Sequence, residues 1–115
     1  MDDTLKAMAA PTRRKILRLV RDGELAAGRI AEHFPSITRP AVSQHLRVLE
    51  DAGLVQVRRE GNRRLYRWRR EGMRDVAGFV DEMWTERLAR LKLAAELEAS
   101  RNAGEPPKPT TGSRT

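Results

Sequence analysis

Residues 38–54, TRPAVSQHLRVLEDAGL, limit the fold more than any other stretch of the chain. Thr38 is a residue type that caps helix N-termini, and Pro40 is tolerated in a first helical turn. Apolar positions then recur at i, i+4 and i+7, namely Val42, Leu46 and Leu49. Gly53 is suited to end the helix. The pattern predicts a helix over about 39–52 with one face in a core.

The opposite face of this helix carries hydrogen-bonding and cationic groups: Arg39, Pro40, Ser43, Gln44 and Arg47. A shorter helix is expected just before it, over about 26–33, with Ile30, Ala31 and Phe34 turned inward. Pro35 and Ser36 separate the two. A helix, a tight turn and a second helix with a polar outer face are typical of helix-turn-helix organisation.

Two further helices are expected at the N-terminus. Leu5 and Met8 lie on one face of the first, and Pro11 fits the first turn of the second. Ile16, Leu17, Leu19 and Val20 supply the apolar positions of the second helix, which ends at Gly23.

A β-hairpin follows the helix-turn-helix. Gly61 and Asn62 suit a two-residue turn that requires positive φ. Counting outward from the turn pairs Val57 with Tyr66 and Val55 with Trp68 on one face, which would cover the core. Arg58 and Arg67 point the other way, and arginines crowd the tip: Arg59, Arg63 and Arg64. A basic hairpin directly after a helix-turn-helix reads as a wing.

Charge is concentrated in this hairpin. Residues 56–70 hold seven arginines and one acid, a balance of +6, whereas the whole chain carries +7. Ordinary soluble surfaces usually mix both signs. Such a dense positive cluster is suited to a polyanion, and nucleic acid is the expected partner.

Residues 71–100 carry one long helical pattern that would span about 45 Å, more than a small domain can cover. Its apolar stripe therefore predicts a partner helix, most simply from a second copy of the chain. We expect one domain over 1–100 and a disordered tail over 101–115, where no large apolar residue occurs. Packing is the expected role of Phe79, Met83 and Trp84, rather than lining a ligand pocket.

Composition excludes several classes of protein. The chain has no cysteine, so it has neither disulfides nor a thiolate nucleophile. We recognise no membrane span, no signal peptide, no phosphate-binding glycine loop and no pair of acids in a plausible cleft. We expect a cytoplasmic protein that is not an enzyme, and we expect no cofactor.

In their order and spacing, PTRRKIL (11–17), PAVSQHLRVLEDAGLV (40–55) and REGNRRLYRW (59–68) resemble the ArsR family of winged-helix repressors. The resemblance implies a mostly α fold with a small β-hairpin and a homodimer joined by the first and last helices. It also implies binding to a pseudo-palindromic operator in double-stranded DNA, with the helix 39–52 in the major groove and the hairpin at the neighbouring minor groove or phosphates.

Two sets of residues follow from this interpretation. The expected DNA-binding residues are Thr38, Arg39, Pro40, Ser43, Gln44, His45, Arg47, Arg58, Arg59, Asn62, Arg63 and Arg64. The expected dimer-interface residues are Leu5, Met8, Val76, Phe79, Val80, Met83, Trp84, Leu88 and Leu91. For His45, a structural hydrogen bond to the neighbouring helix is as good an explanation as a phosphate contact.

The chain departs from the metal-responsive members of that family. Their ELCVCDL motif supplies two thiolates, but ELAAGRI (24–30) places Ala26 and Gly28 at those positions. Their other site uses aspartate and histidine on the last helix. Acids occur there in this chain, but no histidine follows His45. We therefore expect no metal site. Family members also carry an aspartate N-cap where this chain has Ala10.

Two other functions are compatible with the same residues. A winged helix can act as a protein-interaction module, although the arginine-rich hairpin argues against that role. An architectural protein would bind DNA without regard to sequence, and a specificity ratio between operator and random DNA would identify it.

Overall fold

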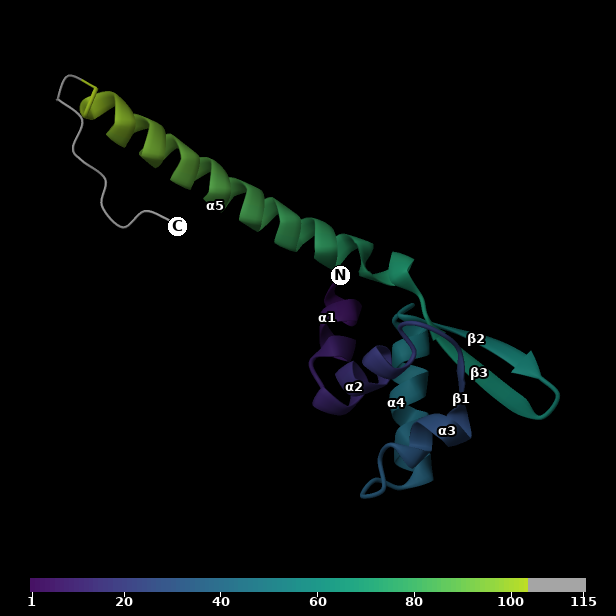
Figure 1. Cartoon of the computed structure of the whole chain (residues 1–115). Helices are drawn as coiled ribbons and strands as arrows, with labels where there is room; N and C mark the ends of the chain where they lie inside the picture. The colour runs from purple at the N-terminus through teal and green to yellow at the C-terminus, as the bar shows by residue number, and fades with distance from the viewer. Residues whose placement is uncertain (104–115) are drawn as a thin grey trace. The chain divides into compact units, whose positions relative to one another are not determined.

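The computed structural model describes residues 1–103, in which short helices and a small sheet are followed along the chain by one long helix (Figure 1). The elements are α1 (Asp2–Met8), α2 (Pro11–Leu19), β1 (Leu25–Ala26), α3 (Ala27–Glu32), α4 (Arg39–Asp51), β2 (Val55–Glu60), β3 (Arg63–Trp68), the 3-10 helix η1 (Arg70–Met73) and α5 (Arg74–Arg101). They form two units: Met1–Phe79, and a second that begins at Val80. The expectation of a mostly α fold with a small β-hairpin is confirmed.

The first unit has one hydrophobic core. The buried face of α4 consists of Val42, Leu46 and Leu49, as the spacing predicted. Around it lie the buried apolar side chains of Ile16 on α2, Ile30 on α3 and Tyr66 on β3, together with Val20 just after α2 and Leu54 just before β2. The core therefore fixes which side of α4 faces solvent.

The ends of α4 are built as the sequence predicted. The Oγ1 atom of Thr38 accepts a hydrogen bond from the backbone N–H of Ala41 at 3.2 Å. At the other end, Gly53 adopts φ +75°. The Gly53 N–H donates to Glu50 O and the Leu54 N–H donates to Leu49 O, both at 2.9 Å. This pair of bonds is the Schellman motif, which satisfies the last carbonyl groups of the helix.

The sheet has three antiparallel strands in the order β1-β3-β2. The hairpin register is as predicted, with Val57 opposite Tyr66 and Val55 opposite Trp68, and the turn Gly61-Asn62 has Gly61 at φ +63°. The third strand was not predicted. Leu25–Ala26 pairs with β3, so Ala26 lies in a strand and α3 begins at Ala27 rather than at residue 26.

The start of the last helix also differs from the prediction of a single helix over 71–100. The 3-10 turn η1 precedes α5 because the chain must pass closely over the end of α4 there. A Cβ atom built on Gly72 would lie 2.0 Å from the carbonyl oxygen of Gly53. Only glycine fits at that approach.

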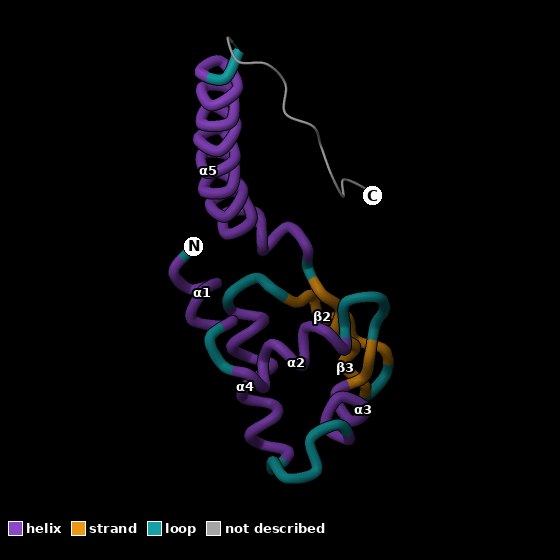
Figure 2. Tube along the Cα trace, turned by 60° about the vertical axis from the view of Figure 1, so that its left-hand side comes forward, coloured by secondary structure: helices purple, strands orange, loops and turns teal. Residues whose placement is uncertain are grey.

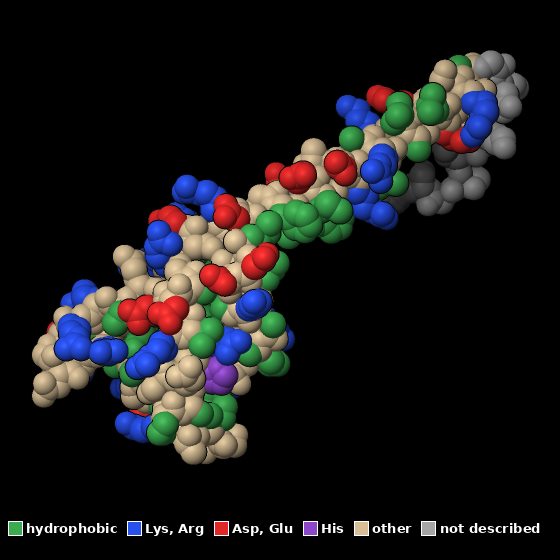
Figure 3. Space-filling view, turned by 180° about the vertical axis from the view of Figure 1, so that it is seen from behind, with side chains coloured by type: hydrophobic (Ala, Val, Ile, Leu, Met, Phe, Trp, Pro, Cys, Tyr) green, Lys and Arg blue, Asp and Glu red, His purple; other side chains and the backbone are tan. Residues whose placement is uncertain are grey.

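The second unit, in its described part, consists of the remainder of α5 and the turn after it. Its large apolar side chains are all exposed, Trp84 at 57%. In Figure 3 green apolar side chains gather on the lower side of α5 near its middle, and others lie on its upper side toward the far end. The predicted tail falls almost entirely at residues 104–115, outside the described part of the chain; Arg101 is the last residue of α5.

No helix within residues 1–103 is both long enough and apolar enough to cross a membrane.

Candidate nucleic-acid interface

Helices α3 and α4 are joined by the turn that Pro35 and Ser36 predicted (Figure 2). The polar face of α4 is exposed to solvent. Six of the predicted contact residues on or next to α4 are exposed: Thr38, Arg39, Pro40, Ser43, Gln44 and Arg47. Because their opposite face is locked into the core, these side chains are held in a fixed order along one surface. That surface offers guanidinium, hydroxyl and amide groups, the set that reads base edges and phosphates.

His45 lies at the edge of this face and is only half-exposed. Its Nδ1 atom is 3.1 Å from Nη1 of Arg13, on α2. Because a guanidinium only donates, Nδ1 must accept, which places the ring proton on Nε2. Partial burial, and next the positive charge of Arg13, lower the pKa of His45. The sequence left two roles open for His45, a structural hydrogen bond to the neighbouring helix and a contact to a DNA phosphate. Arg13 on α2 is the partner that the structural hydrogen bond requires.

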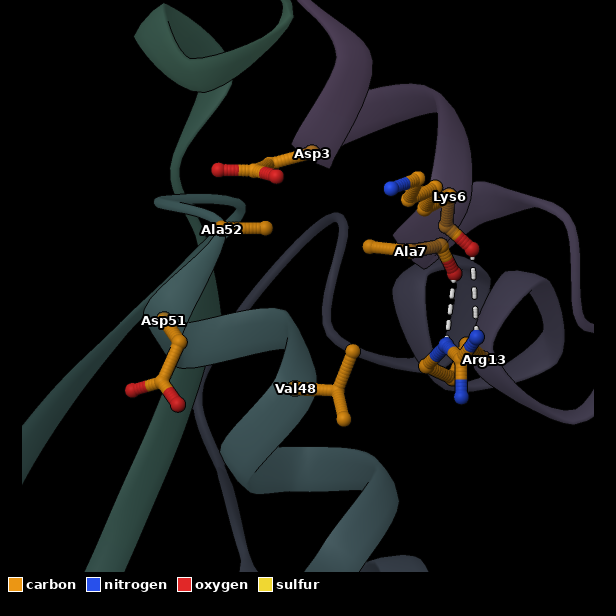
Figure 4. A pocket seen from close by; sticks show the side chains of 7 residues that line it. All are labelled: Asp3, Lys6, Ala7, Arg13, Val48, Asp51 and Ala52. Atoms are coloured by element: carbon orange, nitrogen blue, oxygen red, sulfur yellow. Dashed lines mark hydrogen bonds between the residues drawn. The ribbon is translucent and has the colours of Figure 1, made fainter.

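Arg13 also holds the end of α1. Its Nε donates to Ala7 O at 2.7 Å and its Nη2 donates to Lys6 O at 3.1 Å, as the dashed lines in Figure 4 mark. Arg14 donates to the next two carbonyls, Met8 O and Ala9 O. Hydropathy patterns carry no signal for this role, because both arginines are simply polar positions of α2.

Beside Arg13 is an open hollow of about 340 Å³ (Figure 4). Its apolar wall comes from Ala7 on α1 and from Val48 and Ala52 at the end of α4. The lining side chains place α1 next to the C-terminal end of α4, so Arg13 touches both helices that border the hollow.

The hairpin formed by β2 and β3 is called the wing from here on. Its tip carries exposed cationic groups. Arg59 lies opposite Arg64, and Glu60 lies opposite Arg63. A small hollow of about 180 Å³ at the tip is lined by Arg59, Gly61, Asn62, Arg63 and Arg64. In Figure 3 blue Lys and Arg side chains gather over the wing at the left of the view. The structure thus brings four of the five predicted wing residues together.

The fifth, Arg58, has carboxylate partners instead. Its Nε and Nη2 donate to the two carboxylate oxygens of Glu24 at 3.0 and 2.8 Å, and Nη1 donates to Glu60 at 3.3 Å. The hydrogen bond from Arg58 lowers the pKa of Glu24, and the same bond raises the pKa of Arg58. This pair lies 34 residues apart in sequence, and the sequence alone gave no reason to join them.

The predicted dimer residues fall into two groups. Val76 is 8% exposed, so it has little surface left for a partner. The other predicted residues are exposed or partly exposed in the single chain, so a partner could still cover them: Leu5, Met8, Phe79, Val80, Met83, Trp84, Leu88 and Leu91. Leu93, which the sequence analysis did not single out, is 57% exposed as well.

Metal-ligating side chains are scattered. Within residues 1–103, no three His, Asp or Glu side chains come close enough together to hold an ion. Ala26 is the last residue of β1, and Gly28 lies in the first turn of α3. These are the positions where the metal-responsive relatives were expected to supply their thiolates.

Comparisons with known proteins agree with this geometry. A family model described as a helix-turn-helix domain matches residues 8–58. The transcriptional repressor SdpR of Bacillus subtilis is 46% identical over 61 residues, which are 53% of this chain and 67% of that protein. The HTH-type transcriptional regulator Rv2034 of Mycobacterium tuberculosis is 41% identical over 87 residues, covering 76% of this chain and 80% of that one.

Solved structures are similar over most of their length. A possible transcriptional regulator for arsenical resistance is 41% identical with a TM-score of 0.65, covering 80% of this chain and 95% of its own. The ArsR family transcriptional regulator RHA00566 is 25% identical with a TM-score of 0.68, covering 73% of this chain and 91% of its own.

Proposed function

Because the chain belongs to the ArsR family of winged helix-turn-helix transcriptional regulators, we propose that it is a homodimeric repressor that recognises a pseudo-palindromic operator. The observation that carries this proposal is the exposed polar face of α4, held in register by the buried stripe behind it. The name of SdpR, a transcriptional repressor, supports repression rather than activation.

In this proposal α4 enters the major groove. Gln44 is the main reader, because its amide both donates and accepts and can bond one base edge in two places. Ser43 and Arg47 lie on the same exposed face and supply further contacts. The Oγ1 atom of Thr38 already accepts the hydrogen bond that caps α4. The hydroxyl proton of Thr38 is still available to donate a hydrogen bond to DNA.

The tip of the wing contacts the flanking DNA. Arg59, Arg63 and Arg64 are exposed, and arginine stays charged at any physiological pH. They would bond phosphates or enter the minor groove beside the site read by α4. Arg58 is the weakest candidate of the wing, since its three donor nitrogens already have carboxylate partners.

Two copies are needed to form the repressor. The large apolar side chains from Phe79 to Leu97 on α5 are exposed, and so much exposed apolar surface on one helix favours association. A two-fold dimer presents two copies of α4, which explains why the operator should be pseudo-palindromic with half-sites about one helical turn, or a multiple of it, apart.

We propose further that the repressor does not sense metals. One similar structure carries a name that refers to arsenical resistance. Soft ions of that kind are held by thiolates, and this chain has no cysteine.

The test begins by selecting duplexes from a random pool with the purified full chain. We expect a pseudo-palindromic site bound at least 1,000-fold more tightly than random DNA. Gln44→Ala should then cost on the order of 1–3 kcal/mol on that site and little on random DNA. Arg63→Ala with Arg64→Ala should weaken both duplexes alike and flatten the salt dependence by roughly one unit per lost phosphate contact.

Each rival function has its own outcome in the same experiment. Equal affinity for selected and random duplexes would identify an architectural DNA-binding protein. If no duplex is bound in a salt-dependent way, the result would favour the protein-interaction module instead. If the two variants lose selected and random binding in the same ratio, α4 does not read bases.

A further inference from the structure

A second basic site lies at the base of the wing, away from its tip. It is a hollow of about 320 Å³ lined by Arg21, Gln56, Arg67, Trp68, Arg70 and Glu71. The lining contains three guanidinium groups and one carboxylate. We propose that this hollow is a binding site for a small organic anion that carries a carboxylate or a phosphate group.

The arginines come from three elements that backbone hydrogen bonds hold in place. Arg67 is on β3, directly opposite Gln56 on β2. The Trp68 N–H donates to Val20 O at 3.0 Å, which brings Arg21, the next residue after Val20, to the end of β3. The Arg69 N–H donates to Leu54 O at 2.8 Å and fixes where Arg70 starts η1. The backbone positions of these residues are thus set before any ligand arrives, so binding carries no cost for ordering the backbone.

The guanidinium groups of this cluster have fewer bonded partners than those of the neighbouring arginines. Arg58 is bonded to Glu24 and Glu60, and the Arg69 guanidinium donates to Gly53 O. Within residues 1–103, neither Arg67 nor Arg70 forms an ion pair or a side-chain hydrogen bond. Arg21 has only an exposed contact with Asp22, at 3.5 Å. The lining of the hollow therefore holds three cations and one acid, Glu71. Glu24 lies outside the lining, but the charge of Arg67 still contributes to lowering the pKa of that carboxyl.

The chemistry of these groups selects the ligand. The planar fork of a guanidinium matches carboxylate and phosphate oxygens in pairs, and Gln56 adds an amide that can donate or accept. A volume of about 320 Å³ lies at the lower end of the range found for small-molecule sites, so the ligand is a small metabolite rather than a cofactor.

The hollow is separate from the proposed DNA interface. Four residue steps along β2 separate the ladder pair Gln56–Arg67 from the last pair before the turn, Glu60–Arg63. At roughly 3.3 Å per residue this is about 13 Å. Charges on the surface at that separation are largely screened from one another at about 0.1 M salt.

The proposal is tested with the free protein, in the absence of DNA, so its outcome does not depend on the proposed repressor function. Inorganic phosphate and citrate are titrated separately by calorimetry in chloride buffer at constant ionic strength, and they distinguish a phosphate ligand from a carboxylate ligand. We expect saturable binding of at least one probe, with one site per chain. Arg67→Ala with Arg70→Ala should weaken it at least ten-fold.

The matched control removes the same charge from the wing tip. Arg63→Ala with Arg64→Ala should leave anion binding within two-fold. Gln56→Glu is a second test, because it places a carboxylate opposite Arg67 without removing any arginine, and it should also abolish binding. Circular dichroism and melting temperature check that each variant is folded.

Three results would overturn the assignment. The first is that neither phosphate nor citrate gives a saturable heat of binding in the titration. Equal weakening by the wing-base and wing-tip variants would show general attraction of anions to a basic protein. Loss of duplex affinity in the wing-base variant as large as in the wing-tip variant would make the hollow part of the DNA interface. Anion binding without any duplex binding would instead support this site and contradict the proposed function.

Discussion

Arg13 and His45 are joined by a hydrogen bond of 3.1 Å between Nη1 and Nδ1, which links α2 to the exposed face of α4. The same guanidinium bonds two carbonyl oxygens of α1. The side chain of Arg13 therefore connects its own helix, α2, to both α1 and α4. The bond to α4 exists only while His45 is neutral, because a protonated imidazole has no acceptor nitrogen.

Stability should fall in mild acid for this reason. The pKa of His45 is lowered by burial and by Arg13. Below the ordinary histidine value of about 6.5, the unfolded chain therefore binds more protons than the folded protein does. We expect this stabilisation to be complete above about pH 7 and to be lost as the pH falls through about 6.5 toward the lower folded value. Urea unfolding at several pH values measures it.

His45→Gln is the matched control, because the glutamine carbonyl can still accept from Arg13 but does not titrate. All other groups are shared, so the difference between the two proteins isolates His45. Parallel pH profiles for wild type and variant would contradict the assignment.

Two glycines near the start of α5 should respond oppositely to alanine. A Cβ on Gly72 would meet the Gly53 carbonyl at 2.0 Å, whereas a Cβ on Gly78 has no atom within 4 Å. Gly72→Ala should destabilise the fold by about 1–3 kcal/mol or more through overpacking. Gly78→Ala should stabilise it by about 0.5–1 kcal/mol, since glycine in a helix interior is unfavourable. The free energy of unfolding is measured for all proteins at the same protein concentration. If Gly72→Ala unfolds with the same free energy as the wild type, Gly72 does not lie as close to the Gly53 carbonyl as the structure has it.

Association of two chains should depend on the apolar side of α5. Trp84 and Leu88 are 57% and 58% exposed in the single chain. Replacing both with glutamate would force charges into a contact between helices, and we expect monomers in sedimentation equilibrium.

The control places the same two charges elsewhere on the helix. Thr85→Glu with Ala89→Glu has the same spacing and also adds two negative charges, but lies one residue further around α5. It should remain dimeric. The proposed dimer is wrong if the wild type is monomeric, or if both double variants associate equally well.

Zinc and arsenite should leave operator binding unchanged. The chain has no cysteine, and within residues 1–103 no cluster of three metal-ligating side chains occurs. The measurement is operator affinity with each ion in stoichiometric excess. Release of DNA by either ion, reversed by a chelator, would contradict the proposal.

Much of the interface scaffold could be predicted because its signals are local. The Thr38 cap, the buried stripe of α4, the ending at Gly53 and the hairpin register all depend on residues close together in sequence. The strand β1 could not be predicted, because two residues show no alternation and its partner is 40 residues away.

The unpredicted side-chain pairs have the same physical origin. Glu24 and Arg58 meet across 34 residues, and Arg13 and His45 across 32. Each is an ordinary polar residue in its local pattern, so only the folded backbone reveals the partner. The exposed α4 residues and the wing tip remain predictions as contacts to DNA, although the structure gathers them on α4 and at the wing tip.

The capping of α1 by two arginines has a consequence for the order of folding. A helix of seven residues is too short to persist alone in water, and no glycine closes its C-terminus. Its last carbonyls find their partners on Arg13 and Arg14, which point the right way only once α2 has formed. Helix α1 is therefore a late and conditional element: its amide protons should exchange with solvent no more slowly than those of α2, and any event that loosens α2 releases the N-terminus with it.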